Sequence, residues 1–485
     1  MTAVPERTLD PQDWCAFQAL GHRMVDDMLA TFQGLGEAPA WQPMPEAAKA
    51  RLREPLPQEE GDAATVYEAF KRDVLPYPNG NLHPRFWGWV QGTGTPLGML
   101  ADMLAAGMNP HLAGFEQSAV KVEEQVLDWL KELLGYPAQA SGILTSGGSM
   151  ANLLGLAVAR QAKAPWDLRE EGFQGPGRPR MLVYGSTETH SWAQKACELL
   201  GLGNRSLRRI PVDAEFRIDL PELAAAIGRD RAAGHLPFCI LGTAGTVNTG
   251  AIDDLSALAA LARQQGLWFH VDGAFGALAA LSPAHRSLVA GLEQADSIAF
   301  DLHKWMYLPF EAGCVLMRDS EQHRATFALS PSYLSPSGRG VSASPLKFAD
   351  LGYELTRGFK ALKVWMAIKT HGAQLLGTLV AQNIAQAQYV QARVEADPEL
   401  ELLAPVPLNV VCFRYTAAGF SEAQLDALNQ ELVLRIQESG LAVASSTRIG
   451  GRFALRLAIT NHRSRTEDFD RFLDATLALG RELSR

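Results

Sequence analysis

Two apolar runs that end in charged residues decide the fold of this chain. Residues 268–276 read WFHVDGAFG, and residues 297–305 read SIAFDLHKW. Each run has the length and composition of a buried strand, and polar or small residues follow it at once. In open sheets of parallel strands, ligands bind beyond the carboxyl ends of the strands. Asp272 and Lys304 therefore stand where such a sheet would carry its chemistry.

Similar apolar runs predict further strands on both sides of these two. They cover residues 181–184, 238–241 and 314–317, and helical patterns separate them. Strands that alternate with helices indicate a mainly parallel sheet wrapped by helices, which is the α/β class. We assign residues 92–371 to this large domain.

Two further segments flank the large domain. Residues 372–485 mix helical and strand patterns and predict a small α+β domain. Residues 1–91 combine an apolar helical stripe with a proline-rich stretch. The stripe consists of Phe17, Leu20, Met24, Met28 and Phe32. A helix with little local chain to cover it often packs on another subunit, so we expect this N-terminal arm to form a homodimer.

The composition narrows the class of protein. The 485 residues are 47% hydrophobic and 20% charged, as in soluble globular chains. A net charge of −9 without a long basic run disfavours nucleic acid as a partner. No apolar stretch approaches the ~20 residues that cross a membrane, and the start of the chain lacks a secretory pattern, so we expect a cytoplasmic protein. The scattered cysteines predict neither disulfides nor a metal site.

A glycine-rich turn precedes a predicted helix in the large domain. Residues 145–152 read TSGGSMAN and lead into an apolar helical pattern. Glycines let the backbone approach a ligand closely, and the N–H groups at a helix start attract an anion such as phosphate. Taken alone, a tight turn with Ser149 as the helix cap explains these residues equally well.

Three side chains after predicted strands extend this pattern. Asp272 could hold a proton on a ring nitrogen, although it could also cap a helix. A partly desolvated Lys304 would be a nucleophile that forms a Schiff base with an aldehyde, whereas most lysines are simply solvated. His190 supplies an imidazole, although an isolated histidine is more often a satisfied polar residue. Together with the anion-binding turn, these groups indicate a phosphorylated, nitrogen-containing aromatic aldehyde, which is pyridoxal phosphate.

With these motifs the chain resembles the group II pyridoxal-phosphate decarboxylases, the family of aromatic-L-amino-acid, histidine and glutamate decarboxylases. The resemblance is closest to the aromatic branch and covers nearly the full length. The segments that carry it are residues 83–86 (HPRF), 100–104 (LADML), the turn at Gly147, His190, Gly245-Thr246, His270-Val271-Asp272, His303-Lys304-Trp305 and 357–363 (RGFKALK).

The resemblance implies the type I fold of pyridoxal-phosphate-dependent transferases, a homodimer and a set of catalytic residues. Lys304 would bind the cofactor aldehyde as an imine, and Asp272 would pair with the pyridinium nitrogen. His190 would stack on one face of the ring and Ala274 on the other. The other cofactor contacts would come from Gly148, Ser149, Thr246 and His303. The implied reaction is decarboxylation of an L-amino acid to an amine and carbon dioxide.

One expected contact departs from the family pattern. In the aromatic decarboxylases a tyrosine on a mobile loop is thought to protonate the substrate carbon, and counting back from Arg357 without gaps places Phe348 there. Tyr333, within the loop of residues 330–345, and Tyr353, after it, would serve if the alignment shifts. Phe348 would instead favour decarboxylation coupled to oxidative deamination, which yields an aldehyde.

A second departure is Asp301, which stands where the aromatic branch often has a neutral asparagine near the phosphate. A second anion there is unfavourable unless the Asp301 side chain points away. The competing hypotheses are a non-catalytic relative and a type I aminotransferase. Asp272 and Lys304 are intact, which weighs against the first, and no arginine for a substrate carboxylate can be placed by motif for the second.

The expected substrate is an aromatic amino acid. Residues 86–92 read FWGWVQG, and a strip that contains Trp89 would suit a flat apolar side chain. Core packing explains the same residues nearly as well. Glutamate is less favoured, because this strip contains no arginine.

Overall fold

A seven-stranded sheet forms the centre of the computed structural model, which describes residues 7–173, 177–329, 339–344 and 346–485. The strand order is β2-β8-β7-β6-β5-β3-β4. The strands are β2 (Ser141–Thr145), β3 (Met181–Ser186), β4 (Leu207–Ile210), β5 (Leu236–Thr243), β6 (Trp268–Asp272), β7 (Ser297–Asp301) and β8 (Gly313–Met317). Neighbours are parallel except that β8 runs antiparallel to β2 and β7. The predicted α/β class and mainly parallel sheet are confirmed.

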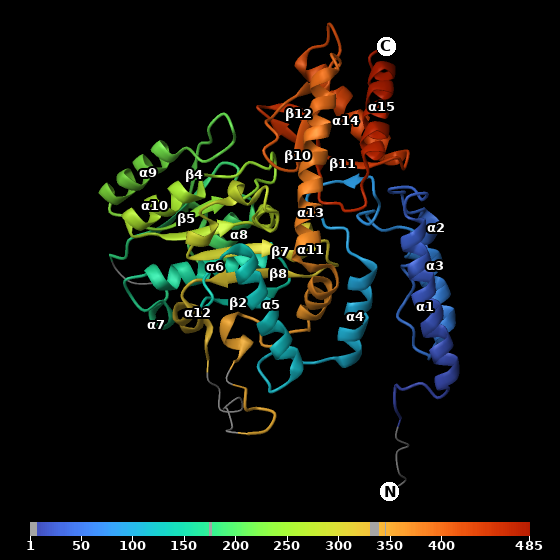
Figure 1. Cartoon of the computed structure of the whole chain (residues 1–485), viewed down its shortest axis with the longest axis horizontal. Helices are drawn as coiled ribbons and strands as arrows, with labels where there is room; N and C mark the ends of the chain where they lie inside the picture. The colour runs from blue at the N-terminus through green and yellow to red at the C-terminus, as the bar shows by residue number, and fades with distance from the viewer. Residues whose placement is uncertain (1–6, 174–176, 330–338, 345) are drawn as a thin grey trace.

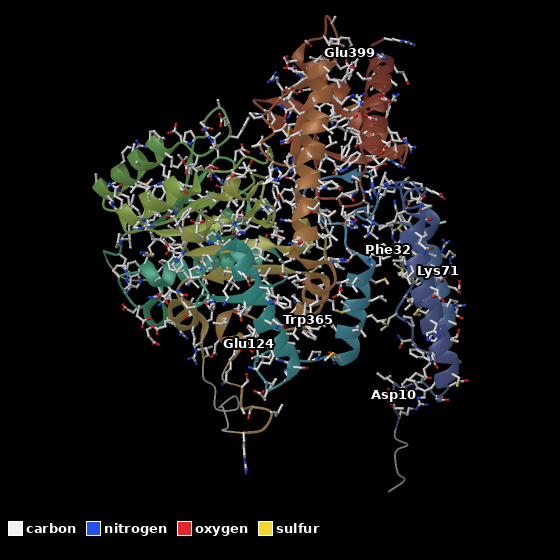
Figure 2. The ribbon with its side chains drawn as sticks, viewed as in Figure 1. Asp10, Phe32, Lys71, Glu124, Trp365 and Glu399 are labelled. Atoms are coloured by element: carbon white, nitrogen blue, oxygen red, sulfur yellow. The ribbon has the colours of Figure 1, made fainter. Side chains whose placement is uncertain are left out.

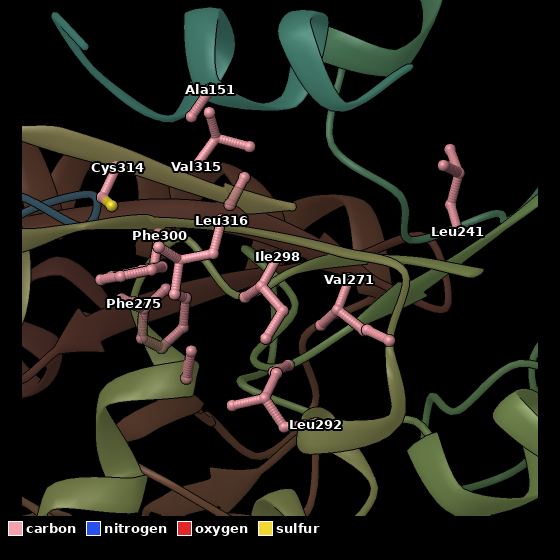
Figure 3. Close-up of a cluster of buried hydrophobic side chains, with 14 of the residues drawn as sticks. Ala151, Leu241, Val271, Phe275, Leu292, Ile298, Phe300, Cys314, Val315 and Leu316 are labelled. Carbon is pink, nitrogen blue, oxygen red and sulfur yellow. The ribbon is translucent and has the colours of Figure 1, made fainter. Parts of the chain in front are cut away.

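Helices wrap this sheet, as Figure 1 shows. They are α5 (Ser118–Leu134), α6 (Gly148–Lys163), α7 (Leu168–Glu171), α8 (Trp192–Leu199), α9 (Leu220–Ala232), α10 (Leu255–Gln265) and α12 (Ser320–Phe327). The inner strands are apolar on both faces because helices cover both. Figure 3 shows Ala151 of α6 facing Val315 of β8, and both side chains are fully buried.

The small domain follows a break in a long helix. Helix α13 (Ala361–Ala396) runs from the large domain into the small one, and Gly372 interrupts it with a φ of 70°. The sequence places the start of the small domain at residue 372, next to this break, and this boundary stays a prediction. The domain's other elements are β9 (Leu400–Leu402), β10 (Val410–Tyr415), α14 (Glu422–Glu438), β11 (Val443–Ile449), β12 (Arg452–Ala458) and α15 (Thr466–Leu483).

The N-terminal segment is less separate than the sequence suggests. Its strand β1 (Phe86–Trp87) pairs in parallel with β11 and completes a sheet in the order β1-β11-β12-β10-β9. Trp87 is fully buried there and stacks on Phe469 of α15, with 4.7 Å between ring centroids. The strip that contains β1 therefore belongs to the packing of the small domain.

The arm consists of α1 (Trp14–Gly34), α2 (Glu46–Arg51) and α3 (Ala63–Asp73), and α4 (Pro96–Met108) follows the proline-rich stretch and β1. Figure 1 shows the arm at the edge of the molecule opposite α9 and α10. Figure 2 labels Phe32 and Lys71 on it, and the Arg463 guanidinium lies 5.4 Å from the Phe32 ring. Within the predicted apolar stripe only Leu20 is buried, and Phe17 is 49% exposed. In the part of the chain that the structure describes, no helix has the length and apolarity to span a membrane.

Candidate active site

The candidate site forms where two neighbouring strands end. Strand β6 ends at Asp272, and its parallel neighbour β7 ends at Asp301. The chain then enters the short helix α11 (Leu302–Trp305), which carries Lys304. Because parallel neighbours end at the same edge of a sheet, Asp272 and Lys304 are brought together.

Helix α11 is anchored to α13, the helix that connects the two domains. The indole N–H of Trp305 and the hydroxyl of Tyr307 donate to Asn383 Oδ1 at 2.9 and 2.8 Å. Asn383 also donates to the backbone oxygen of Asn461 in the small domain at 3.0 Å. These buried hydrogen bonds fix the position of the backbone next to Lys304.

A cavity of about 660 Å³ opens at this edge of the sheet. It brings together eight of the ten residues predicted for the site, namely Trp89, Gly148, Ser149, His190, Asp272, Ala274, His303 and Lys304. Its wall also includes Glu188, Trp192, Asp301, Phe310 and Glu311. The cavity thus holds the amine, the imidazole, the carboxylate and the glycine-rich turn that sequence reasoning combined.

The glycine-rich turn presents backbone N–H groups to the cavity. Helix α6 begins at Gly148 with Gly147 before it, and within the described residues no side chain caps it. Ser149 is therefore not the helix cap. A Cβ on Gly148 would lie 2.7 Å from Asp301 Oδ2, so only glycine lets the turn approach this carboxylate. Free N–H groups at the start of a helix are a binding site for an anion.

Two donors hold the Asp272 carboxylate, which is 5% exposed. The indole N–H of Trp192 donates to Oδ2 at 2.5 Å, and the backbone N–H of Ala274 donates to Oδ1 at 3.1 Å. A carboxylate held in this way keeps a fixed orientation. The carboxylate can accept one further hydrogen bond, from an N–H or O–H group in the cavity.

Lys304 is paired with a buried acid. Its Nζ lies 2.9 Å from Oδ2 of Asp301, and its side chain is 22% exposed. Asp301 is 1% exposed, and its Oδ1 has no hydrogen-bond partner among the described residues. The condition that Asp301 point away from the site is therefore not met, because its carboxylate faces Lys304 and Gly148.

Both histidines of the cavity have lowered pKa values. Burial lowers the pKa of His303, whose Nδ1 accepts the backbone N–H of Ala312 at 3.2 Å. Desolvation by the surrounding chain likewise lowers the pKa of His190, and the nearby Lys304 ammonium adds to this while Asp272 opposes it. His190 opens into the cavity, and its Nδ1 accepts the backbone N–H of Trp192 at 3.2 Å. Both rings are therefore neutral near pH 7.

Two predicted contacts, Phe348 and Thr246, do not line this cavity, and their roles stay predictions. Phe348 lies in a 3₁₀ turn (Phe348–Leu351) and is 1% exposed, with the Arg357 guanidinium 5.0 Å from its ring. It packs in the core and does not line the cavity. Thr246 is also buried and does not line the cavity. Its hydroxyl forms a hydrogen bond with the hydroxyl of Thr249 at 3.0 Å and accepts the Ala251 N–H.

Of the two alternative proton donors, the structure describes Tyr353. Tyr353 is 86% exposed and lines a second cavity of about 370 Å³ with Phe115 and Phe327. Tyr333 and most of the loop of residues 330–345 lie outside the described residues.

Sequence reasoning missed Trp192 as a site residue. It is the first residue of α8, and a tryptophan at the start of a short apolar helix is indistinguishable from a core residue. The signal was its place two residues after His190, at the end of a buried strand.

The residues present fit pyridoxal phosphate. The uncapped start of α6 suits the phosphate, the fixed carboxylate of Asp272 suits a protonated ring nitrogen, and Lys304 supplies an amine at the cavity surface. Only the Asp301 carboxylate opposes a phosphate at this place. Within the described ranges, no group of three or more histidine, cysteine or acidic residues is arranged to hold a metal ion.

Comparisons with known proteins agree with this site. A family model described as "Pyridoxal-dependent decarboxylase conserved domain" matches residues 45–416. The chain is 33% identical over 471 residues to an aromatic-L-amino-acid decarboxylase of Bacillus atrophaeus, covering 96% of this chain and 95% of that one. It is 29% identical to a phenylacetaldehyde synthase of Arabidopsis thaliana, covering 93% of each chain. The crystal structure of Oryza sativa TDC with PLP and tryptamine superposes with a TM-score of 0.91 at 27% identity, covering 99% of this chain and 100% of that one.

Proposed function

This chain belongs to the pyridoxal-dependent decarboxylase family, and from that membership we propose that it converts an aromatic L-amino acid to the corresponding amine and carbon dioxide. Its cofactor is pyridoxal phosphate. The observation that carries the proposal is the convergence of Lys304, Asp272 and the turn at Gly148 in one cavity.

Each of these residues has a distinct task. When bound, pyridoxal phosphate supplies an aldehyde that condenses with amines and a ring that accepts electrons from a breaking bond. Lys304 would hold the cofactor through its amine, at the aldehyde carbon. Asp272 keeps a proton on the ring nitrogen. The N–H groups of Gly148 and Ser149 bind the phosphate, while His190 and Ala274 pack on opposite faces of the ring.

The protein selects the reaction by orientation. Of the bonds at the substrate α-carbon, the one perpendicular to the ring breaks most easily. Cavity walls that held the substrate carboxylate in this direction would select decarboxylation. Because the His190 imidazole is neutral, it places no positive charge beside the ring that would attract the substrate carboxylate.

An aromatic substrate is supported by two rings at the cavity. Trp89 and Phe310 line it and are 53% and 50% exposed, whereas Trp87 of the same strip is buried in the small domain. Trp89 also has a left-handed backbone with a φ of 51°, an unusual conformation for a bulky residue. Such strain is typical of residues held for function. The carboxylates of Glu188 and Glu311 in the same wall disfavour an acidic side chain.

Aldehyde formation is the second candidate, and the relative named phenylacetaldehyde synthase supports it. The argument from Phe348 no longer does, because this residue packs in the core. A non-catalytic role has less support, since the cavity holds both Lys304 and Asp272.

We also propose a homodimer formed through the arm and α4. Large apolar side chains remain exposed there, namely Trp14, Phe17, Met103, Leu104 and Met108. Large apolar side chains left exposed in this way support a protein interface. The cytoplasmic location stays a prediction from the sequence.

Substitution of Lys304 tests the function directly. We expect Lys304→Ala to abolish carbon dioxide release, because no other amine reaches the aldehyde carbon from this position. The assay offers Phe, Tyr, Trp and Dopa separately and measures carbon dioxide, amine, aldehyde and peroxide together. Lys163→Ala is the control, since Lys163 donates to the Gly266 oxygen on the surface. Comparable turnover in Lys304→Ala would overturn the assignment of the nucleophile.

A further inference from the structure

Trp192 contacts both groups that face the cofactor ring in the proposed function. Its indole N–H donates to Asp272 Oδ2 at 2.5 Å, and its backbone N–H donates to His190 Nδ1 at 3.2 Å. One residue at the start of α8 thus touches the partner of the ring nitrogen and the residue that packs on the ring face.

The indole has little freedom to move. Trp192 is 3% exposed, and its ring meets His270 edge to face, with 5.7 Å between centroids and 76° between planes. His270 is itself held at both nitrogens, by Ser297 Oγ and by Asn152 Oδ1, each at 2.7 Å. Asn152 Nδ2 donates to the Gly148 oxygen at 2.7 Å, so the same network reaches the phosphate-binding turn.

The two hydrogen bonds have different consequences. The backbone bond makes His190 Nδ1 an acceptor, so the neutral imidazole carries its proton on Nε2. The indole bond fixes the rotamer of Asp272 and disperses part of its negative charge in a site where it is 5% exposed. Without this donor, the Asp272 carboxylate would lose one of the two hydrogen bonds that hold its orientation.

We propose that Trp192 is a positioning residue that holds the Asp272 carboxylate aimed at the ring nitrogen of the cofactor, and that orients His190 through its backbone. The inference rests on the proposed cofactor site and adds to it a residue that controls the proton on the ring nitrogen. It concerns the indole N–H, because the backbone donor is present whatever the side chain.

Trp192→Phe isolates that donor, because it removes the N–H and retains an aromatic ring. We expect the dissociation constant for pyridoxal phosphate to rise about tenfold, as is typical for the loss of a hydrogen bond to a charged group. We also expect the pH midpoint of the visible absorbance of the bound cofactor to move by about one unit. A purely structural role would leave this midpoint unchanged.

Trp87→Phe is the matched control. Trp87 is equally buried and donates its indole N–H to Ser464 Oγ at 2.9 Å, in the core of the small domain. It should leave both the dissociation constant and the midpoint as in the wild type. An unchanged midpoint in Trp192→Phe, or an equal change in Trp87→Phe, would overturn the inference.

A measurement on the wild type without cofactor covers the case in which Trp192→Phe does not fold. In a ¹H–¹⁵N spectrum, we expect one indole resonance far downfield that moves upfield in Asp272→Asn. If no indole signal responds to that change, the hydrogen bond is absent and the inference fails. Failure of the wild type to bind pyridoxal phosphate would instead refute the proposed function.

Discussion

Asp301 is the residue whose charge conflicts most with the cofactor. Its buried carboxylate pairs with Lys304 and faces the turn at Gly148, where the phosphate is proposed to bind. We expect Asp301→Asn to bind pyridoxal phosphate about tenfold more tightly, because repulsion between like charges at close range costs at least ~1 kcal/mol in a partly desolvated site. Equilibrium dialysis measures the dissociation constant.

Asp296→Asn controls for the loss of a carboxylate beside the same strand. Asp296 precedes β7 at its other end and accepts the Phe269 N–H at 2.8 Å, outside the cavity. This variant should bind the cofactor as the wild type does. Weaker binding by Asp301→Asn would show instead that the pair with Lys304 serves mainly to hold the amine.

The sequence could predict most of the site at the residue scale because its members follow strand ends. Asp272 and Lys304 each come directly after an apolar run, so their meeting follows from the parallel sheet. Phe348 could not be placed in this way, because counting back from Arg357 assumes a loop without gaps. Trp192 was missed because its indole N–H acts over 80 positions of sequence, on Asp272.

At the scale of elements, apolar runs predicted the inner strands well. The bounds of the five predicted strands differ from the observed ones by at most two residues at either end. Strands β1, β2, β4, β9 and β11 were missed, and two of them have weak signals: β1 has only two residues, and β4 carries two arginines in the sequence LRRI. Strand β1 is placed by pairing with β11, which lies far away in the sequence. Strand β4 is placed by pairing with β3, which carries the apolar pattern instead.

The loop before α4 and helix α11 approach each other so closely that only glycine fits. A Cβ on Gly92 would lie 1.6 Å from the His303 oxygen and 2.8 Å from the Lys304 oxygen. We expect Gly92→Ala to push α11 away from its position and to cost ~3 kcal/mol or more in stability, with weaker cofactor binding. Thermal unfolding with and without pyridoxal phosphate measures both effects.

Gly107→Ala provides the comparison within the same region. Gly107 lies in α4 with no atom within 4 Å of an added Cβ. Alanine there should be neutral or stabilise the helix by ~0.5–1 kcal/mol. A Gly92→Ala protein as stable as Gly107→Ala would contradict the close approach of the loop to α11.

At the scale of the whole molecule, buried histidines set the response to acid. Burial lowers the pKa of His83, His270 and His323 to about 4 each. The unfolded chain takes up these protons near pH 6.5, whereas the folded chain does so only near pH 4. Above pH 6.5 these histidines therefore do not reduce the free energy of unfolding. As the pH falls from 6.5 to 4, each of them lowers it by about 3 kcal/mol.

Asp253 acts in the opposite sense, because burial raises its pKa to about 6, so it offsets part of this loss. Burial also lowers the pKa of His462 to about 4 and raises the pKa of Asp296. Four histidines outweigh two aspartates, and we expect the midpoint temperature of unfolding to fall steadily between pH 6.5 and 4. His323→Gln should flatten the profile, since glutamine can replace the bonds to Ser141 and the Leu351 oxygen. An equal flattening by His22→Gln, at an exposed position, would contradict the role of buried histidines.

At the scale of the whole molecule, the arm leaves large apolar side chains exposed to solvent. Helix α1 is tied to α3 mainly by polar contacts, such as Tyr67 to Asp27 at 2.9 Å, and leaves apolar side chains exposed. In the proposed dimer those side chains gain burial from a second copy, so the wild type should have twice the mass of the 52.6 kDa chain in light scattering at micromolar concentration. Phe17→Glu with Leu104→Glu should yield a folded monomer, because two charges buried at an interface cost several kcal/mol. Leu199→Glu, at a 75% exposed leucine of α8, should remain dimeric. A wild type of single-chain mass would refute the dimer.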